Sequence, residues 1–166
     1  KIVNHPHIQR WFIQNYDGST KHTKIKNYPI GLDLHTGKWL MEFSSKQKYQ
    51  FYKEVRDKKI ERINNKIFCD IHLRPTHPER KELYEKIRNN KHIYFLEKEL
   101  QFKEIIHEYR KHLFILSPRG NGLDCHRTWE ALFLGCIVVT KTSTLDPMWV
   151  DHQLPVVILN KWSDLN

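Results

Sequence analysis

Charged and small side chains gather between residues 117 and 130, where residue types and spacing suit ligand chemistry. Arg119, Gly120 and Gly122 lie in a short turn, and glycine can take a positive φ or let a ligand approach the backbone closely. Asp124 follows at the position of a helix N-cap. The first turn of a helix has unpaired N–H groups and a partial positive charge. The stretch therefore predicts an anion-binding loop that leads into a helix N-terminus.

The helix expected from Asp124 to about Leu134 carries polar side chains on one face. His126, Arg127 and Glu130 lie three or four residues apart, so they share that face near the N-terminal end. Guanidinium groups suit a diphosphate, and the carboxylate of Glu130 suits sugar or ribose hydroxyls. An ordinary surface ion pair between Arg127 and Glu130 fits the same spacing, and the sequence leaves both interpretations open.

Apolar runs on either side place this helix in a strand–loop–helix–strand unit. Strands are expected at 113–117 and 136–140, and Gly135 fits the position that ends the helix. Four apolar side chains at helical spacing are expected to pack on a sheet: Trp129, Leu132, Phe133 and Cys136.

The second half of the chain alternates strands with helices. Further strands are expected at 67–72, 92–96 and 155–159, and helices at 79–88 and 101–111, with Pro78 in a first helical turn. A polar linker is expected at 58–65, and a final helix with Ser163 as its N-cap. This alternation predicts an α/β fold, a Rossmann-like parallel sheet with helices on both faces.

Parallel sheets bind ligands beyond the carboxyl ends of their strands. That rule adds Arg74, Lys141 and Thr142, although a polar exit loop fits residues 141–144 equally well. Met148 and Trp149 either form an apolar lip or cover the sheet. The candidate binding residues are Arg74, Ser117, Arg119, Gly120, Asn121, Gly122, Asp124, His126, Arg127, Glu130, Lys141 and Thr142.

The segment SPRGNGLDCHRTWEALFLGCIVV, with LPVVILNKW at 154–162, resembles the C-terminal donor-binding half of exostosin-like glycosyltransferases, of the kind seen in algae and large DNA viruses. The similar motif is an Arg-Gly loop, a downstream Arg, and Glu-Ala-Leu-x-x-Gly-Cys-Ile. The resemblance implies a GT-B fold and a sugar-nucleotide donor. Carried over by motif, the donor contacts fall to Arg119, Arg127 and Glu130. Val138 stands where the family usually has Pro, at a strand end outside the site.

With this resemblance, residues 1–59 are expected to form the end of an N-terminal lobe and a connecting helix, and residues 60–166 the nucleotide-sugar-binding α/β domain. A short element at 8–15 is expected to place Trp11 and Phe12 against a core. A strand is expected from residue 24 into a turn near residue 31.

A helix is expected over 39–59, with four buried side chains: Phe43, Phe51, Tyr52 and Val55. The resemblance also implies that Gly31, Leu32, Asp33 and His35 border the ligand. A surface loop is the alternative.

The formal net charge of +9 attracts polyanions. The basic residues are dispersed, and no zinc-finger, basic-zipper or RNA-recognition signature is present. A non-catalytic module that binds nucleic acid or sulfated glycan is therefore the alternative function. The chain lacks GxGxxG and GxxxxGK[ST], which argues against dehydrogenases and P-loop NTPases.

Cysteine and histidine spacing predicts neither a disulfide framework nor a metal site. The three cysteines form no CxxC pair, and the eleven histidines lack ligand-type spacing near carboxylates. No Asp-x-Asp pair is present to hold a metal on a diphosphate.

Together with the resemblance, which implies a glycosyltransferase that moves a sugar from a nucleotide-sugar to a glycan or protein acceptor, the sequence predicts a metal-independent enzyme without a cofactor and without nucleic acid. The resemblance implies inversion of configuration, and no catalytic base is assigned. No signal-peptide pattern or apolar run of membrane-span length occurs. Because the chain starts at Lys1, we expect a fragment, from either the Golgi or ER lumen or a virus-infected host's cytoplasm.

Overall fold

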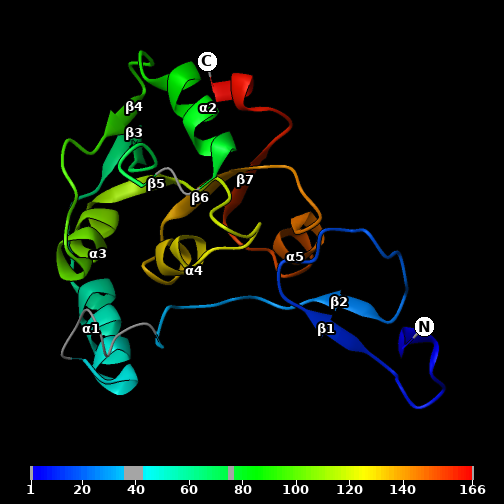
Figure 1. Ribbon diagram of the computed structural model, residues 1–166. Helices are drawn as coiled ribbons and strands as arrows, with labels where there is room; N and C mark the ends of the chain where they lie inside the picture. The colour runs from blue at the N-terminus through cyan, green and yellow to red at the C-terminus, as the bar shows by residue number, and fades with distance from the viewer. Residues whose placement is uncertain (1, 36–42, 75–76, 166) are drawn as a thin grey trace.

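A computed structural model describes residues 2–35, 43–74 and 77–165, and its centre is a five-stranded sheet (Figure 1). The strands are β3 (Ile63–Cys69), β4 (Ile93–Phe95), β5 (His112–Leu116), β6 (Ile137–Lys141) and β7 (Val156–Leu159). They run in the order β4-β3-β5-β6-β7, and every neighbouring pair is parallel. The predicted Rossmann-like α/β fold is confirmed. That this unit is one lobe of a GT-B fold stays a prediction.

Helices cover both faces of the sheet. They are α1 (Ser45–Asp57), α2 (Pro78–Ile87), α3 (Phe102–Lys111), α4 (His126–Phe133) and α5 (Asp146–Asp151). Figure 1 shows α2 on one side and α3 and α4 on the other. Successive side chains of a strand point to opposite faces, so Ile115 packs with the core that includes α3, whereas Leu116 packs with the core that includes α2.

Two helix boundaries lie where local signals predict them, the start of α2 and the end of α4. Pro78 occupies the first turn of α2, and the His77 side chain accepts a hydrogen bond from the backbone of Glu79. Gly135 takes a φ of 76° after α4. There the N–H of Cys136 bonds to Ala131 and the N–H of Gly135 to Leu132, the pattern of a Schellman C-cap.

Helix α1 begins later than the sequence pattern indicates. Residues 36–42 lie outside the described residues, Phe43 is not helical, and Ser44 caps the helix through a reciprocal capping box with Gln47. Of the expected apolar positions, Tyr52 and Val55 are buried in the core of the α/β sheet.

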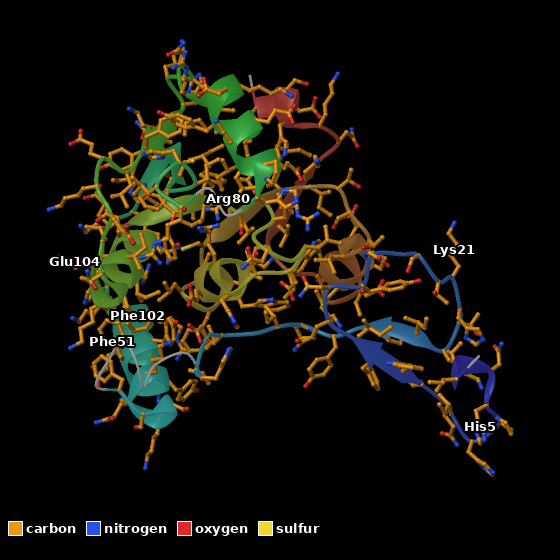
Figure 2. The ribbon with its side chains drawn as sticks, in the orientation of Figure 1. His5, Lys21, Phe51, Arg80, Phe102 and Glu104 are labelled. Atoms are coloured by element: carbon orange, nitrogen blue, oxygen red, sulfur yellow. The ribbon has the colours of Figure 1, made fainter. Side chains whose placement is uncertain are left out.

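The other two expected positions of this helix, Phe43 and Phe51, are half-buried. The Phe51 ring lies 5.8 Å from that of Phe102, between α1 and α3 (Figure 2). The expected boundary between residues 59 and 60 stays a prediction.

The N-terminal segment carries a short 3-10 helix, η1 (Ile2–Asn4), and a two-stranded parallel sheet of β1 (Trp11–Ile13) and β2 (Ile25–Asn27). The pair projects from the α/β unit (Figure 1). Trp11 is 37 % exposed and Phe12 56 % exposed. The prediction that both pack against a core is wrong, because a pair of three-residue strands buries little of its own surface.

Several further expectations need correction near the sheet. The expected linker at 58–65 already contains the start of β3. Ser163 lies inside a 3-10 helix, η2 (Trp162–Leu165), and is not an N-cap. Met148 and Trp149 belong to α5 and are buried against a cluster that includes residues of β7, so they cover the sheet.

No helix among the described residues is long and apolar enough to cross a bilayer.

Candidate functional site

The strand order reverses between β3 and β5, because the chain leaves β3 toward β4 and returns on the other side of β3. Open parallel sheets bind ligands beyond the carboxyl ends of strands at such a switch point. A cavity of about 380 Å³ lies there. We call it the switch-point pocket, and its polar lining residues include Asp70, Arg80, Tyr109, His126, Arg127 and Glu130.

Arg127 is held in this pocket by two groups from other elements. Its Nη2 lies 3.1 Å from Oδ1 of Asp70, and its Nε donates to the Tyr109 hydroxyl at 3.2 Å. Burial opposes the charge of the guanidinium, but Asp70 and Tyr109 raise the pKa of Arg127 well above its ordinary value. Arg127 therefore stays charged and pairs with Asp70. The alternative that the sequence left open, a surface ion pair between Arg127 and Glu130, does not form.

A second guanidinium, that of Arg80 on α2, lines the same pocket. Arg80 is only 3 % exposed. Burial lowers the pKa of Arg80 and the nearby charge of Arg127 lowers it further, while Asp70 opposes both effects. Two buried guanidinium groups thus line one partly enclosed cavity, together with the carboxyl groups of Asp70 and Glu130.

Glu130 lies on the same helix as Arg127 but has a different environment. The Tyr52 hydroxyl of α1 donates to its Oε1 at 2.6 Å. Burial raises the pKa of Glu130, and the hydrogen bond from Tyr52 only partly opposes that shift. Burial also raises the pKa of Tyr52, with the Glu130 charge as the next cause. The carboxyl group is therefore fixed by α1 at the pocket wall.

The segment after β2 reaches the pocket through His126. Nδ1 of His126 lies 2.8 Å from the carbonyl oxygen of Gly31. Asp33 lines the switch-point pocket, and its Oδ2 lies 3.2 Å from Nζ of Lys48. Of the four residues that the resemblance places beside a ligand, Asp33 thus lies at the candidate site.

Asp124 has a structural position. It is buried, with Oδ2 accepting from the backbone N–H of Ile30 at 2.7 Å and Oδ1 from Nε1 of Trp129 at 2.8 Å. Burial raises its pKa against these hydrogen bonds. The N-cap of α4 is Cys125, which makes no side-chain capping bond. The prediction of Asp124 as N-cap is wrong because its carboxylate fastens the N-terminal segment instead.

The two loop glycines do not take a positive φ, unlike Gly31 and Gly135. A Cβ on Gly122 would lie 2.3 Å from Oδ1 of Asn15, and that oxygen accepts from the N–H of Asp124 at 2.6 Å. Close approach does occur here, but to the chain's own Asn15. Gly120, by contrast, lines the switch-point pocket.

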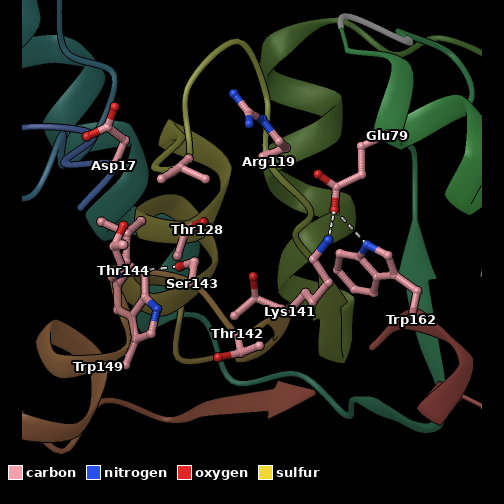
Figure 3. A pocket seen from close by; sticks show the side chains of 13 residues that line it. Asp17, Glu79, Arg119, Thr128, Lys141, Thr142, Ser143, Thr144, Trp149 and Trp162 are labelled. Atoms are coloured by element: carbon pink, nitrogen blue, oxygen red, sulfur yellow. Dashed lines mark hydrogen bonds and ion pairs between the residues drawn. The ribbon is translucent and has the colours of Figure 1, made fainter. Parts of the chain in front are cut away.

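A second cavity, of about 290 Å³, borders the 117–125 loop and is lined by two further charged candidates, Arg119 and Lys141 (Figure 3). We call it the Lys141 pocket, lined by Glu79, Arg119, Lys141, Thr142, Trp149 and Trp162. Lys141 forms an ion pair with Glu79, which also accepts from Nε1 of Trp162 at 2.9 Å. Burial opposes ionisation of Glu79, but these two hydrogen bonds lower its pKa.

Arg119 differs from Arg127 in its contacts. It lies in the Lys141 pocket, where its Nη2 donates to the carbonyl of Asn121 at 3.3 Å. Its buried Nε has no hydrogen-bond partner within the described residues.

The twelve candidate residues therefore separate into three groups. The switch-point pocket contains Arg74, Gly120, His126, Arg127 and Glu130. The Lys141 pocket contains Arg119, Lys141 and Thr142. Neither cavity is lined by Ser117, Asn121, Gly122 or Asp124.

Two candidates from these groups make contacts that limit their role. Ser117 is buried, and its hydroxyl lies 2.9 Å from that of Thr128. It therefore ties the end of β5 to α4. Arg74 is exposed at the pocket edge and pairs with Glu99.

Sequence patterns missed three of the six polar residues that were named for the switch-point pocket. Asp70 directly follows β3, so the rule on carboxyl ends that selected Arg74 could have selected it too. Arg80 and Tyr109 lie inside helices. Their spacing there predicts a solvent-exposed charge for Arg80 and an apolar packing contact for Tyr109, and neither pattern indicates a binding residue.

No protein-family model and no curated protein matches this sequence.

Proposed function

We propose that this chain is the donor-binding part of a glycosyltransferase and that the diphosphate of a nucleotide-sugar binds in the switch-point pocket. The observation that carries the proposal is the position of Arg127, which is charged, nearly buried and fixed in the first turn of α4. Arg80 faces the same cavity, and Gly120 leaves one part of its wall without a side chain. A doubly charged phosphate group complements these features.

The reaction in this proposal is a direct displacement at the anomeric carbon of the donor sugar, with inversion. Negative charge grows on the departing diphosphate, and Arg127 and the N–H groups of α4 stabilise it there. Glu130, held by Tyr52, accepts hydrogen bonds from donor hydroxyls. The diphosphate step needs no metal ion in this scheme. A glycan or protein supplies the attacking hydroxyl, and the base that deprotonates it is not assigned.

Contacts redistribute the roles among the candidates. Arg119, Lys141 and Thr142 line the Lys141 pocket, so the proposal removes them from the diphosphate contact. The contacts of Ser117 and Asp124 assign both residues to support of the loop.

Calorimetric titration with UDP-, GDP- and CMP-sugars tests the proposal. One donor class should bind saturably, and Arg127→Ala should weaken it at least about tenfold, the value of a charge-assisted hydrogen bond. Arg119→Ala is the matched control, since it removes a guanidinium from the other pocket, and its affinity should stay within about twofold. Arg127→Lys keeps the charge that balances Asp70, so it separates loss of binding from loss of folding.

Failure of all three donor classes to bind, or equal affinity in Arg127→Ala and wild type, would overturn the proposal. Binding of an oligonucleotide with a steep fall in affinity as salt rises would instead support the polyanion-binding module, which the net charge of +9 favours.

A further inference from the structure

Three potential metal ligands meet beside the switch-point pocket. Asp33, His35 and His126 each offer one ligand atom, and these atoms lie within 4.8 Å of one another. We infer that they form a binding site for a divalent transition-metal ion of the Zn²⁺ class. His35 and His126 are far apart in the sequence, so no spacing pattern indicates the site.

The distances allow a single ion to reach all three side chains after small rotations. Zinc binds imidazole nitrogen and carboxylate oxygen at about 2.0–2.2 Å, so tetrahedral ligand atoms lie about 3.4 Å apart. The ligand atoms, which lie up to 4.8 Å apart, must therefore approach one another by up to about 1.4 Å. The His35 side chain is 74 % exposed, and its Nδ1 already lies 3.5 Å from Oδ1 of Asp33.

Groups around the cluster orient two of the ligands. Nδ1 of His126 lies 2.8 Å from the carbonyl oxygen of Gly31. A carbonyl only accepts, so Nδ1 carries the proton and Nε2 keeps the lone pair that binds a metal. Oδ2 of Asp33 lies 3.2 Å from the buried ammonium of Lys48, while Oδ1 lies on the side of His35. Hydrogen-bonded outer partners of this kind are typical of metal-binding histidine and carboxylate side chains.

The ligand set selects the class of ion. Two imidazoles and one carboxylate suit zinc and its neighbours, whereas Mg²⁺ and Ca²⁺ prefer oxygen ligands. Three protein ligands leave a fourth position open. Asp33 and His126 also line the switch-point pocket, so water or a bound molecule in that pocket completes the coordination. The inferred site shares this pocket with the proposed diphosphate contact but uses different side chains, since Arg127 contacts Asp70 and Tyr109.

Titration of the metal-free chain with Co²⁺ and Zn²⁺, without nucleotide, tests the inference. Co²⁺ should give visible absorption bands of tetrahedral intensity, and Zn²⁺ should abolish them at one equivalent. His35→Ala should weaken Zn²⁺ binding at least about tenfold. This exposed side chain contributes little to folding, so loss of binding reports on the ligand. Asp33→Asn should weaken binding similarly.

A second pair of histidines provides the matched control. The rings of His5 and His7 lie 5.4 Å apart on the N-terminal segment. Figure 2 shows His5 far from Arg80, which lines the pocket. The double variant His5→Ala, His7→Ala should retain the Co²⁺ spectrum and the Zn²⁺ affinity. Loss of the spectrum only in this variant, unchanged affinity in His35→Ala, or displacement of Co²⁺ by equimolar Mg²⁺ would each overturn the inference. Because no donor is present, none of these results bears on the proposed transfer reaction.

Discussion

Gly122 is needed because of a contact that the loop sequence does not reveal. Its missing Cβ leaves room for the Asn15 side chain, which accepts a hydrogen bond from Asp124. Asp124 in turn binds the backbone of Ile30 and the indole of Trp129. Two adjacent polar groups thus join the N-terminal segment to the loop ahead of α4. Gly122 therefore allows a contact within the fold, although the glycine-containing loop sequence predicts a ligand at this point.

Gly122→Ala should destabilise the protein by about 1–3 kcal/mol, because Asn15 must move and the N–H of Asp124 loses its partner. Gly120→Ala is the control from the same loop, since its Cβ would lie 3.6 Å from that of Cys125, an ordinary contact. Urea unfolding of both variants measures the difference. Equal midpoints for the two would contradict the role given to Asn15.

Glu130 should make stability depend on pH in a defined direction. Burial raises its folded-state pKa above 4.5, so the folded state holds the proton at pH values where the unfolded state has lost it. The free energy of unfolding therefore falls as pH rises from about 4.5 through the raised pKa.

Glu130→Gln should lose this part of the pH dependence while its side-chain oxygen still accepts from Tyr52. Asp124, whose pKa is also raised, is present in both proteins. The difference between their two unfolding curves across pH therefore isolates Glu130. A difference that stays constant across pH, or one that grows in favour of wild type as pH rises, would rule out this account.

At the scale of elements, helix α1 is positioned by one capping box and one buried face. The Ser44 side chain accepts from the N–H of Gln47 at 3.3 Å, and the Gln47 side chain accepts from the N–H of Ser44 at 2.8 Å. Tyr52 on this helix then reaches Glu130 of α4. Order in the pocket therefore depends on a helix outside the predicted strand–loop–helix–strand unit.

Ser44→Ala should cost about 1 kcal/mol, because the first turn loses a side-chain partner for its backbone. Lys46→Ala changes an exposed position of the same turn and should have an effect below about 0.5 kcal/mol. Thermal unfolding followed by circular dichroism compares them. If the nucleotide site depends on α1 as inferred, Ser44→Ala should also lower donor affinity slightly at temperatures near the melting point.

For the whole molecule, aromatic residues divide between a packed α/β unit and a projecting N-terminal pair of strands. Trp149 is 4 % exposed and its ring lies 5.4 Å from that of Trp129. Trp11 is 37 % exposed on β1. Side chains of the same size therefore contribute differently to stability.

Trp149→Ala should lower the free energy of unfolding by about 3–5 kcal/mol, since it leaves a cavity between α5 and the sheet. Trp11→Ala should change it by less than about 1 kcal/mol. Denaturant titration measures both, and Trp149→Phe serves if the alanine variant does not fold. Similar losses at the two positions would show that the N-terminal pair is buried in solution.

The α/β elements were predictable because their signals are local. Apolar periodicity, Pro78 at the start of α2 and Gly135 after α4 act within a few residues, so the elements and the parallel sheet follow from short windows of sequence. The prediction that Trp11 and Phe12 pack against a core was wrong, because the exposure of an aromatic side chain depends on which other elements pack against it, and a local sequence pattern does not contain that information.

The sequence by itself determined that an Arg- and Gly-containing loop precedes a helix beyond the end of a parallel strand. Only tertiary structure decided which side chains share a cavity. Arg127 meets Asp70, His126 meets Gly31, and Arg119 lies in a different pocket from both. The reason is physical: these partners come from separate strands, helices and loops, and the order of the strands, which no local pattern encodes, brings them together.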